Sequence, residues 1–299
     1  MQYAILLTTS LLVAQPAPDA LGPGNCKHSI TVDGRKREHW IHVPTKYDAK
    51  KPTPVVVALH GATMVHKLME MYTGLDKTAD DNNFIVVYPN GELLTWNAGL
   101  FPGDLNKTDD VKYLNKVLDD VEGCLNVDRK RVYFTGMSNG GMMCYRVAAE
   151  MSERVAAIAP VGGTMSVKKY EPKRPVPVVH FHGTKDTLVP FDGPLKFTAT
   201  PGLLSFRSVK DTLDVCIKTN GCDEKGKESA VDVNEKLMKV MCTEFLCPKK
   251  KADVVLYTIE NGGHTWPGSP FAASWMGPAT RNFSANAIMW EFFKSHPLR

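Results

Sequence analysis

The sequence predicts an α/β fold with a mostly parallel central sheet, flanked by helices and preceded by an antiparallel hairpin. The first observation is the order of the patterns. Strand-like apolar runs alternate with helix-like segments after the hairpin, which is typical of a parallel sheet with helices on both faces. The second is that 52–60 and 84–88 are continuous apolar runs, typical of strands buried on both faces. The third is a glycine-flanked serine at 136–140, between a strand pattern and a helix pattern.

Length and composition agree with this architecture. With 299 residues, 43% of them apolar and 23% charged, the chain can bury a sizeable core. We expect one catalytic domain over 25–299 with a cysteine-containing insertion at about 194–250. The net charge of +4 is small, and the one dense basic run, 249–251, has no interleaved aromatic residues. We therefore expect no nucleic-acid partner.

The first half of the chain carries distinct local signals. A hairpin is predicted at 29–43, because two β-type runs surround Asp33-Gly34, a pair that favours a tight turn. Residues 66–82 are predicted to be helical, although Gly74 weakens the middle. A helix is also predicted at 109–124, where Asp109 or Asp110 can cap its start. Its apolar residues recur on one face, and they are Val111, Leu114, Val117, Leu118 and Val121.

The second half continues the alternation of strands and helices. The predicted strands cover 131–135, 155–161, 177–182 and 253–259, and the predicted helices cover 142–151, 206–218 and 284–295. Between the third and fourth of these strands, the stretch 194–250 is polar, and we expect it to be irregular apart from its helix.

The N-terminus resembles an export signal. Ala4–Ala14 is apolar and then broken by prolines, a length that suits a signal peptide and is too short to span a bilayer. A positive charge before this run is missing. We expect residues 1–24 to be signal peptide and linker, the protein to be secreted or periplasmic, and no segment to be anchored in a membrane.

The chain has seven cysteines, four of them between 216 and 247. Export makes disulfides plausible, and the odd number leaves at least one thiol free. Cys144 is the choice for the free thiol, because it lies in a helix where it acts as a small apolar residue. The cysteine spacings match no common zinc pattern, so we expect no metal.

The candidate nucleophile is Ser138, in the pentapeptide Gly136-Met137-Ser138-Asn139-Gly140. A strand pattern precedes the pentapeptide and a helix pattern follows it. In that context the G-x-S-x-G motif predicts a nucleophile elbow, which exposes the serine hydroxyl at the end of a strand. The alternative is a glycine-rich turn without catalytic function.

A serine hydroxyl needs a base, and the base needs an orienting acid. Asp186 follows the strand at 177–182, and His264 follows the strand at 253–259 within a glycine-rich loop. The chain order Ser138, Asp186, His264 is that of α/β-hydrolases. Asp192 is the main alternative acid, and Asp211 is a weaker one.

The other histidines have less support as the base. His60 and His182 each precede a glycine at a strand end, and we expect both to shape their loops. His180 and His182 share one face of a strand. A metal pair is conceivable there, but hydrogen-bonded strand histidines are the favoured interpretation.

Backbone N–H groups should stabilise the oxyanion formed by attack on an ester. One is expected from Asn139 and the other from the loop after the 52–60 strand, with Ala62 preferred. Trp96 and Trp266 lie in loops near the same rim. They could form a wall for an aromatic or sugar substrate, or they could simply pack the rim. No dinucleotide- or phosphate-binding glycine motif occurs, so no cofactor is expected.

Taken together, these motifs resemble the secreted polyhydroxybutyrate depolymerase and feruloyl esterase group of α/β-hydrolases, which also includes carbohydrate esterases. The resemblance extends from about residue 30 to the C-terminus and implies the same triad. The matching segments are Leu59-His60-Gly61, Tyr88-Pro89-Asn90-Gly91, Thr95-Trp96-Asn97-Ala98-Gly99, Asp109-Asp110-Val111, Gly136-Met137-Ser138-Asn139-Gly140-Gly141-Met142, His182-Gly183-Thr184-Lys185-Asp186 and Gly263-His264-Thr265-Trp266-Pro267-Gly268.

Two segments depart from the pattern of this group, and both border the expected substrate cleft. One is Leu100–Asp104, and the other is the lysine-rich stretch 223–251 with its extra cysteines. Asn220-Gly221-Cys222 resembles the cysteine-containing loop of the group. From that resemblance we expect a Cys222–Cys242 bridge, although the sequence does not determine the pairing.

The sequence therefore predicts a monomeric, secreted serine esterase that needs no metal or organic cofactor. The expected substrates are feruloyl or acetyl esters of plant polysaccharide. The alternative is a hydroxyalkanoate oligoester, the substrate of a polyhydroxybutyrate depolymerase. A serine peptidase and a non-catalytic binding protein on the same fold are weaker alternatives.

Overall fold

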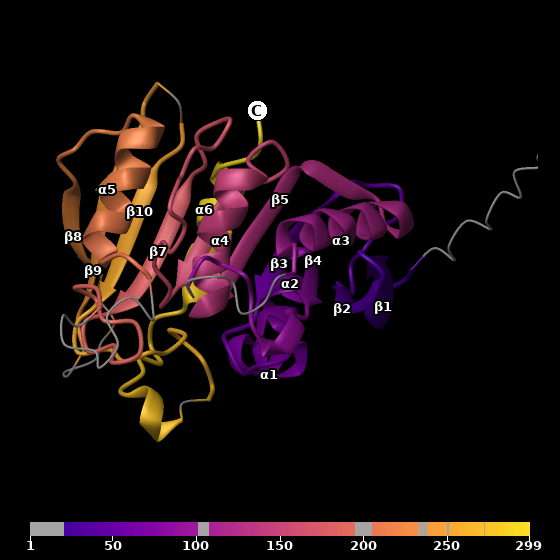
Figure 1. The fold of residues 1–299 in the computed structure, drawn as a ribbon, viewed down its shortest axis with the longest axis horizontal. Helices are drawn as coiled ribbons and strands as arrows, with labels where there is room; N and C mark the ends of the chain where they lie inside the picture. Colours follow the sequence, from indigo (N-terminus) through magenta and orange to yellow (C-terminus); the bar gives the residue numbers. More distant parts are fainter. Residues whose placement is uncertain are drawn as a thin grey trace, which may run out of the picture.

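Ten strands form one continuous sheet in the computed structural model (Figure 1). Their order across the sheet is β1-β2-β4-β3-β5-β6-β7-β10-β9-β8. The structure describes residues 21–100, 108–194, 205–231, 233, 238–249, 251–271 and 273–299. The strands are β1 (Gly24–Val32), β2 (Arg35–Val43), β3 (Thr53–Leu59), β4 (Ile85–Pro89), β5 (Val127–Met137), β6 (Ala157–Val161), β7 (Val178–Gly183), β8 (Lys227–Val231), β9 (Val240–Phe245) and β10 (Val254–Ile259).

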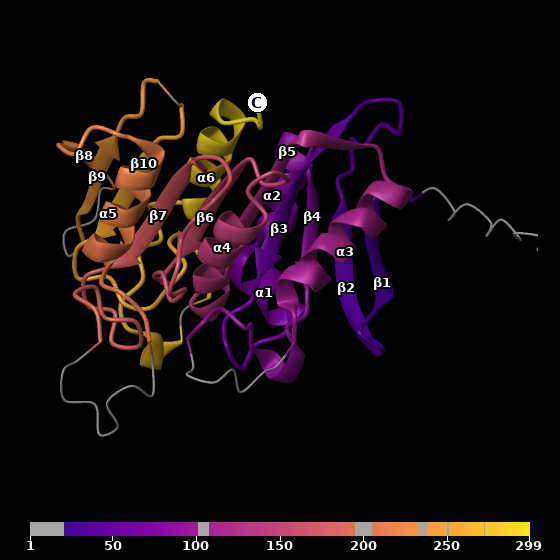
Figure 2. The same ribbon diagram turned by 45° about the horizontal axis from the view of Figure 1, so that its top comes forward.

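The centre of the sheet is parallel and its two edges are antiparallel. All neighbours from β4 through β3, β5, β6 and β7 to β10 pair in parallel. The hairpin β1–β2 joins β4 antiparallel at one edge, and β9 and β8 continue antiparallel from β10 at the other (Figure 2). The predicted α/β-hydrolase architecture is confirmed, including the N-terminal hairpin.

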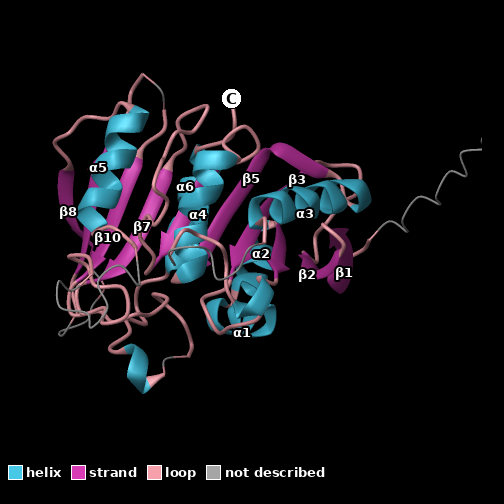
Figure 3. Ribbon diagram, in the orientation of Figure 1, coloured by secondary structure: helices cyan, strands magenta, loops and turns pink. Residues whose placement is uncertain are grey.

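Helices cover both faces of the sheet, as the sequence predicts (Figure 3). Buried residues of α3, α4 and α5 belong to one apolar core, and those of α1, α2 and α6 belong to a second core on the other face. Within the described part of the chain, no helix combines the length and the apolar character needed to cross a bilayer. The helices are α1 (His66–Thr73), α2 (Leu75–Asn82), α3 (Asp110–Cys124), α4 (Asn139–Glu150), α5 (Val209–Asn220) and α6 (Ala285–Ser295), with short 3-10 turns η1 (Glu92–Leu94) and η2 (Ser274–Met276).

Two expected elements differ from the structure. The single helix predicted over 66–82 is two helices, because Gly74 adopts a left-handed conformation with φ of 60°. The stretch 194–250 was expected to be irregular apart from its helix, yet it contains β8 and β9. Much of β8 is exposed, so it lacks the apolar pattern that marks a strand in a sequence. The predicted signal peptide and linker at 1–24 lie almost wholly outside the described residues, as do the loop 101–107 and part of the insertion.

The disulfide joins Cys222 to Cys247, so the expected Cys222–Cys242 pairing is wrong. Cys222 follows the end of α5, and Cys247 follows the end of β9. A hydrogen bond from the N–H of Asp223 to the carbonyl of Leu246, 3.0 Å long, holds these two chain segments together. Cys242 instead lies within β9 opposite Tyr257 of β10, and its thiol is free. Cys144 is free and buried in α4, as predicted.

A buried ion pair connects the hairpin to the segments before the elbow. The Arg37 guanidinium donates to Asp110 Oδ1 at 2.9 Å and to the carbonyl of Asn90 at 3.0 Å, and it lies over the ring of Tyr113. The other carboxylate oxygen of Asp110 accepts the N–H of Asn97 at 2.8 Å. Burial raises the pKa of Asp110, so the carboxylate depends on these donors to remain charged.

We expect Arg37→Ala to lower the free energy of unfolding by about 3–5 kcal/mol, because it leaves a buried carboxylate without its counter-charge. Arg35→Ala is the matched control. Arg35 pairs with Glu92 at the surface, and an exposed pair is worth about 0–1 kcal/mol. Urea unfolding of both variants measures the difference. Equal losses would show that the Arg37 pair does not stabilise the fold in this way.

Candidate active site

Ser138 lies at the sharp turn between β5 and α4. Its φ of 57° and ψ of −120° place it in a strained region of backbone conformation that a nucleophile elbow requires. The turn also brings backbones close together. A Cβ on Gly140 would lie 2.2 Å from the carbonyl oxygen of Leu59, and one on Gly163 would lie 2.1 Å from that of Ser138. Only glycine fits at these two positions.

His264 and Asp186 form a direct pair beside this turn. His264 Nδ1 lies 2.7 Å from Asp186 Oδ2, and both side chains are buried. Asp186 Oδ1 accepts the N–H groups of Leu188 at 2.9 Å and Val189 at 2.8 Å, so the carboxylate is fixed from both sides. The alternative acids Asp192 and Asp211 are both exposed.

The charge on Asp186 is well stabilised. Burial alone would raise the pKa of this carboxyl, but hydrogen bonds from His182 and His264 outweigh burial and hold the pKa far below its usual range. The acid is therefore ionised at neutral pH and well below it. An ionised partner at Nδ1 keeps the imidazole tautomer with its lone pair on Nε2, which is the arrangement that a general base needs.

Ser138 and His264 line one cavity of about 540 Å³. Gly61, Ala62 and Thr63, from the loop after β3, line the same cavity. Among the described residues, neither the N–H of Ala62 nor that of Asn139 donates to a backbone carbonyl. The prediction that these two groups form the oxyanion hole stays a prediction.

His60 shapes the loop that carries Ala62. Its Nε2 accepts the N–H of Gly91 at 2.8 Å, and its carbonyl accepts the indole N–H of Trp96 at 2.9 Å. Burial lowers the pKa of His60 to about 4, so the ring is neutral and can accept that hydrogen bond. The predicted structural function of His60 agrees with these contacts.

Trp96 and Trp266 do not form a wall for the substrate. Trp96 is 1% exposed and Trp266 is 0% exposed, and neither lines the cavity. Trp96 packs beside the elbow, where its backbone N–H donates to Asn139 Oδ1 at 2.6 Å. Trp266 donates through its indole to Asn286 at 2.8 Å. Both residues pack the rim, which is the alternative that the sequence leaves open.

His180 and His182 belong to a buried hydrogen-bond chain behind the acid. Tyr145 OH contacts His180 Nδ1 at 2.9 Å, His180 Nε2 contacts His182 Nδ1 at 3.0 Å, and His182 Nε2 contacts the carbonyl of Val189 at 2.8 Å. The chain ends in the loop that holds Asp186. In the described residues these histidines are not part of any three-ligand metal cluster.

The wall of the cavity was not predicted from the sequence. It is apolar and comes from the loop after β3, from α1, from the loop after β7 and from the segment around η2. The side chains that form it are Met64, Leu68, Met71, Tyr72, Leu188, Phe271, Trp275 and Met276. Phe271 and Trp275 are 52% and 68% exposed, which is unusual for aromatic residues. The sequence signal that could have pointed to this wall is the presence of Phe271 and Trp275 in the segment that follows His264.

Comparison with known proteins places the chain in a family. The model of the dienelactone hydrolase family matches residues 103–200. A protein of Nocardia uniformis subsp. tsuyamanensis named "Putative esterase NocK" is 31% identical over 85% of this chain and 78% of its own length. "Probable feruloyl esterase C" of Aspergillus niger is 24% identical over 92% of this chain and 91% of its own length. The chain belongs to the feruloyl and acetylxylan esterase group of α/β-hydrolases.

A solved structure agrees with the fold. The acetyl xylan esterase from Aspergillus awamori superimposes with a TM-score of 0.60 and 16% identity, over 90% of this chain and 99% of that one. The resemblance found in the sequence is thereby confirmed for its feruloyl esterase part, while no polyhydroxybutyrate depolymerase is named among these relatives. Membership of this group makes the protein a carboxylic ester hydrolase.

The neutral, buried state of His60 predicts a pH dependence of stability. The folded pKa of about 4 lies below the unfolded value of ~6.5, so between these pH values only the unfolded chain binds this proton. The contribution of His60 to the free energy of unfolding is fully present above pH ~6.5. It falls as the pH is lowered, with a maximal slope of about 1.4 kcal/mol per pH unit.

We expect His60→Gln, which can still accept the N–H of Gly91, to reduce the loss of unfolding free energy between pH 7 and pH 5. Burial also lowers the pKa of His180. His180 therefore contributes a pH dependence of the same sign to the wild type and to His60→Gln. Urea unfolding at several pH values measures the two slopes. If the unfolding free energy changes with pH equally in the wild type and in His60→Gln, His60 binds its proton equally in the folded and unfolded states. The neutral, buried state assigned to His60 is then wrong.

Proposed function

We propose that the protein is an exported serine esterase that releases hydroxycinnamic acids, such as ferulic acid, from plant polysaccharide. The observation that carries the substrate class is the apolar cavity beside Ser138. Its volume of about 540 Å³ suits a small-molecule site, and methionine, leucine and aromatic side chains dominate its wall. A flat aromatic acyl group would bury its ring there, whereas an acetyl group would leave most of the cavity unfilled.

In this proposal Ser138 Oγ attacks the ester carbonyl while His264 accepts its proton. The carbonyl π electrons move to oxygen, and the N–H groups of Asn139 and Ala62 stabilise that oxyanion. When the intermediate collapses, the bond to the alcohol breaks, and His264 returns the proton to the leaving sugar oxygen. A water molecule, deprotonated by His264, then attacks the acyl-enzyme through the same steps and releases the acid and the free Ser138 hydroxyl. Asp186 orients His264 and balances the charge of the imidazolium.

Export is the second part of the proposal. It rests on the apolar run at residues 4–14 and is supported by the Cys222–Cys247 disulfide, since disulfides persist mainly in oxidising compartments. A secreted enzyme would meet plant polysaccharide directly. The names of the curated relatives, feruloyl esterase C among them, agree with an ester substrate of this class.

Ser138→Ala tests the reaction itself. We expect the kcat for p-nitrophenyl acetate and for methyl ferulate to fall by at least about 10³-fold, because the covalent route is lost. Ser295→Ala, an exposed serine in the last turn of α6, is the control and should retain wild-type rates. The measurement is the initial rate of the wild type, Ser138→Ala and Ser295→Ala on both substrates under the same conditions. Equal activity of wild type and Ser138→Ala would refute the nucleophile.

Trp275→Ala tests the substrate class. We expect kcat/KM for methyl ferulate to fall about 10-fold, mainly through KM, because an exposed ring that would cover the substrate is removed. For p-nitrophenyl acetate the change should stay within about 3-fold, since its acyl group is too small to reach that wall. Leu246→Ala removes another exposed apolar side chain, one that is not among the residues lining the cavity, and serves as the control.

The same comparison separates the competing substrates. Release of ferulate, acetate and 3-hydroxybutyrate from their esters is measured under identical conditions. A wild-type enzyme that prefers acetate, with Trp275→Ala unaffected on every substrate, would favour an acetyl esterase. Preferential release of 3-hydroxybutyrate would favour the hydroxyalkanoate oligoester.

A further inference from the structure

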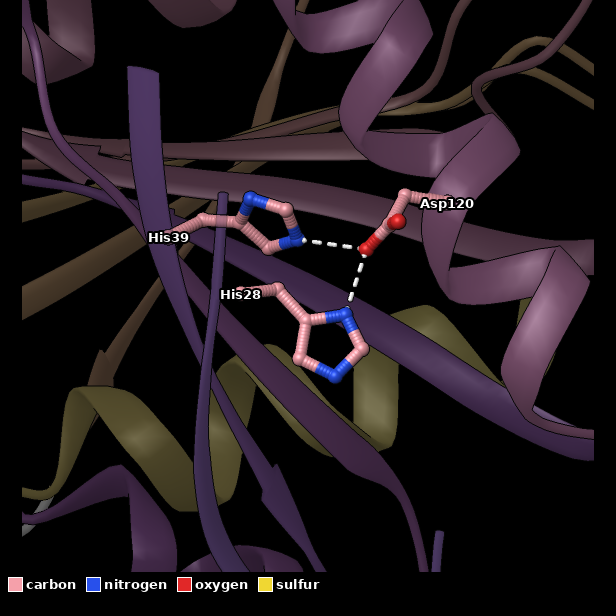
Figure 4. A group of neighbouring side chains, drawn as sticks. All are labelled: His28, His39 and Asp120. Atoms are coloured by element: carbon pink, nitrogen blue, oxygen red, sulfur yellow. Dashed lines mark hydrogen bonds and ion pairs between the residues drawn. The ribbon is translucent and has the colours of Figure 1, made fainter. Parts of the chain in front are cut away.

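Three potential metal ligands meet at the edge of the sheet opposite the disulfide. They are His28 of β1, His39 of β2 and Asp120 of α3 (Figure 4). Asp120 Oδ2 lies 2.7 Å from His28 Nδ1 and 3.0 Å from His39 Nε2, and the three ligand atoms all lie within 4.8 Å of one another. This is the one such cluster in the described residues.

The fold itself brings these three side chains together. His28 and His39 are directly opposite each other in the β1–β2 register, so their side chains point to the same face of the hairpin. The helix α3 crosses that face. An ion pair between Lys112 and Asp33 holds its first turn, and Asp120 meets the histidines two turns later. The cluster is thus set by backbone register and does not depend on a flexible loop.

The charge of Asp120 has no permanent counter-ion. Its ion-pair partners among the described residues are the two histidines, with no lysine or arginine beside them. Asp110, the buried carboxylate at the start of the same helix, has Arg37 as its counter-ion. A carboxylate that faces two imidazoles, which are the commonest metal ligands in proteins, has the donor set of a cation site.

We propose that His28, His39 and Asp120 bind a divalent cation of the zinc class and that this cation fastens the edge hairpin to α3. Two imidazole nitrogens and one carboxylate oxygen suit such an ion better than they suit calcium or magnesium, which prefer oxygen ligands. Ligand bonds of about 2.0–2.2 Å in tetrahedral geometry put neighbouring donors roughly 3.3–3.5 Å apart. The present separations of 2.7 and 3.0 Å need to open only slightly to admit the ion.

The site has one buried and one open side. His39 is fully buried, while the side chains of His28 and Asp120 are 21% and 27% exposed. An ion can therefore enter from solvent, and water can complete the coordination. His39 Nδ1 has no hydrogen-bond partner, so the ring lacks the outer support that metal-bound histidines usually have. Such support is worth about 10–100-fold in affinity, and we therefore expect micromolar rather than nanomolar binding.

The site lies far along the sheet from the candidate active site. The hairpin β1–β2 forms one edge, and β5, which leads to Ser138, is separated from it by β4 and β3. The cation therefore stabilises the hairpin and takes no part in ester hydrolysis. An edge strand gains from such an attachment, and among the described residues β1 is hydrogen-bonded to β2 alone.

The test is zinc binding to the full-length protein after dialysis against a chelator. Isothermal titration with ZnCl₂ should give one site per chain with a micromolar dissociation constant. Zinc at 100 times that constant should raise the Tm by several degrees, and a chelator should reverse the rise. Esterase activity should be the same with and without zinc.

Two variants remove a ligand with little change of shape, Asp120→Asn and His28→Gln. Each should weaken zinc binding at least 10-fold and abolish the rise in Tm. His296→Gln is the matched control, because His296 pairs with Asp253 at 3.2 Å without a third ligand, and it should bind zinc as the wild type does. Cys26→Ser, which removes a nearby partly exposed thiol, should also bind normally.

Some results would overturn the proposal. These are binding that persists unchanged in both ligand variants, binding that is lost in Cys26→Ser, and the absence of any binding below about 1 mM zinc. Circular dichroism and methyl ferulate turnover show whether each variant is folded. If one of the two ligand variants, Asp120→Asn or His28→Gln, fails to fold, the other one carries the test. If ester hydrolysis fails in the wild type while zinc binds as expected, only the proposed function is refuted.

Discussion

The close approach of three backbone segments at the end of β5 is the constraint on which the site depends. The carbonyl oxygens of Leu59 and Ser138 occupy the space where Gly140 and Gly163 would carry side chains. This contact forces the left-handed conformation of Ser138 and brings the loop after β3 alongside the start of α4. The same packing therefore holds Ser138 at the turn and brings Gly61 and Ala62 of the loop after β3 to the cavity that Ser138 lines. A larger side chain at either glycine would disturb all of these features together.

A second set of contacts keeps the loops around the elbow rigid. Asn139 is the residue after Ser138, and its side-chain amide holds the backbone of Trp96, whose indole in turn holds the carbonyl of His60. The backbone N–H of Asn139 is thus a candidate oxyanion donor, while its side chain is a structural clamp. This arrangement explains why Trp96 is buried although it lies in a loop beside the site. The tryptophan ties the loop after β4 to the loop after β3, which lines the cavity with Gly61, Ala62 and Thr63.

Sequence reasoning succeeded where local pattern and position carry the information. Buried strands such as β3 and β4 are apolar throughout, and parallel strands place the residues after them at one edge of the sheet, which is why Asp186 and His264 could be chosen and are found paired. Sequence reasoning failed for features that depend on which residues lie close together in the folded chain. β8 is exposed and has no apolar pattern, and the partner of Cys222 depends on where β9 ends. The cavity wall combines α1, Leu188 and the segment from Phe271 to Met276, which no local pattern connects.

The two ends of the sheet show how one fold can divide chemistry from stability. At its centre, Asp186 has a fixed set of hydrogen-bond donors and a histidine partner that faces a cavity, so its charge can serve a reaction. At the β1 edge, Asp120 also faces two histidines, of which His39 is fully buried, and among the described residues β1 pairs with β2 alone. A carboxylate in the first setting orients a base. In the second setting the pair is not among the residues that line the candidate cavity, and it joins the hairpin to α3. The surroundings of a histidine–carboxylate pair, and not the pair itself, determine which of these two functions it has.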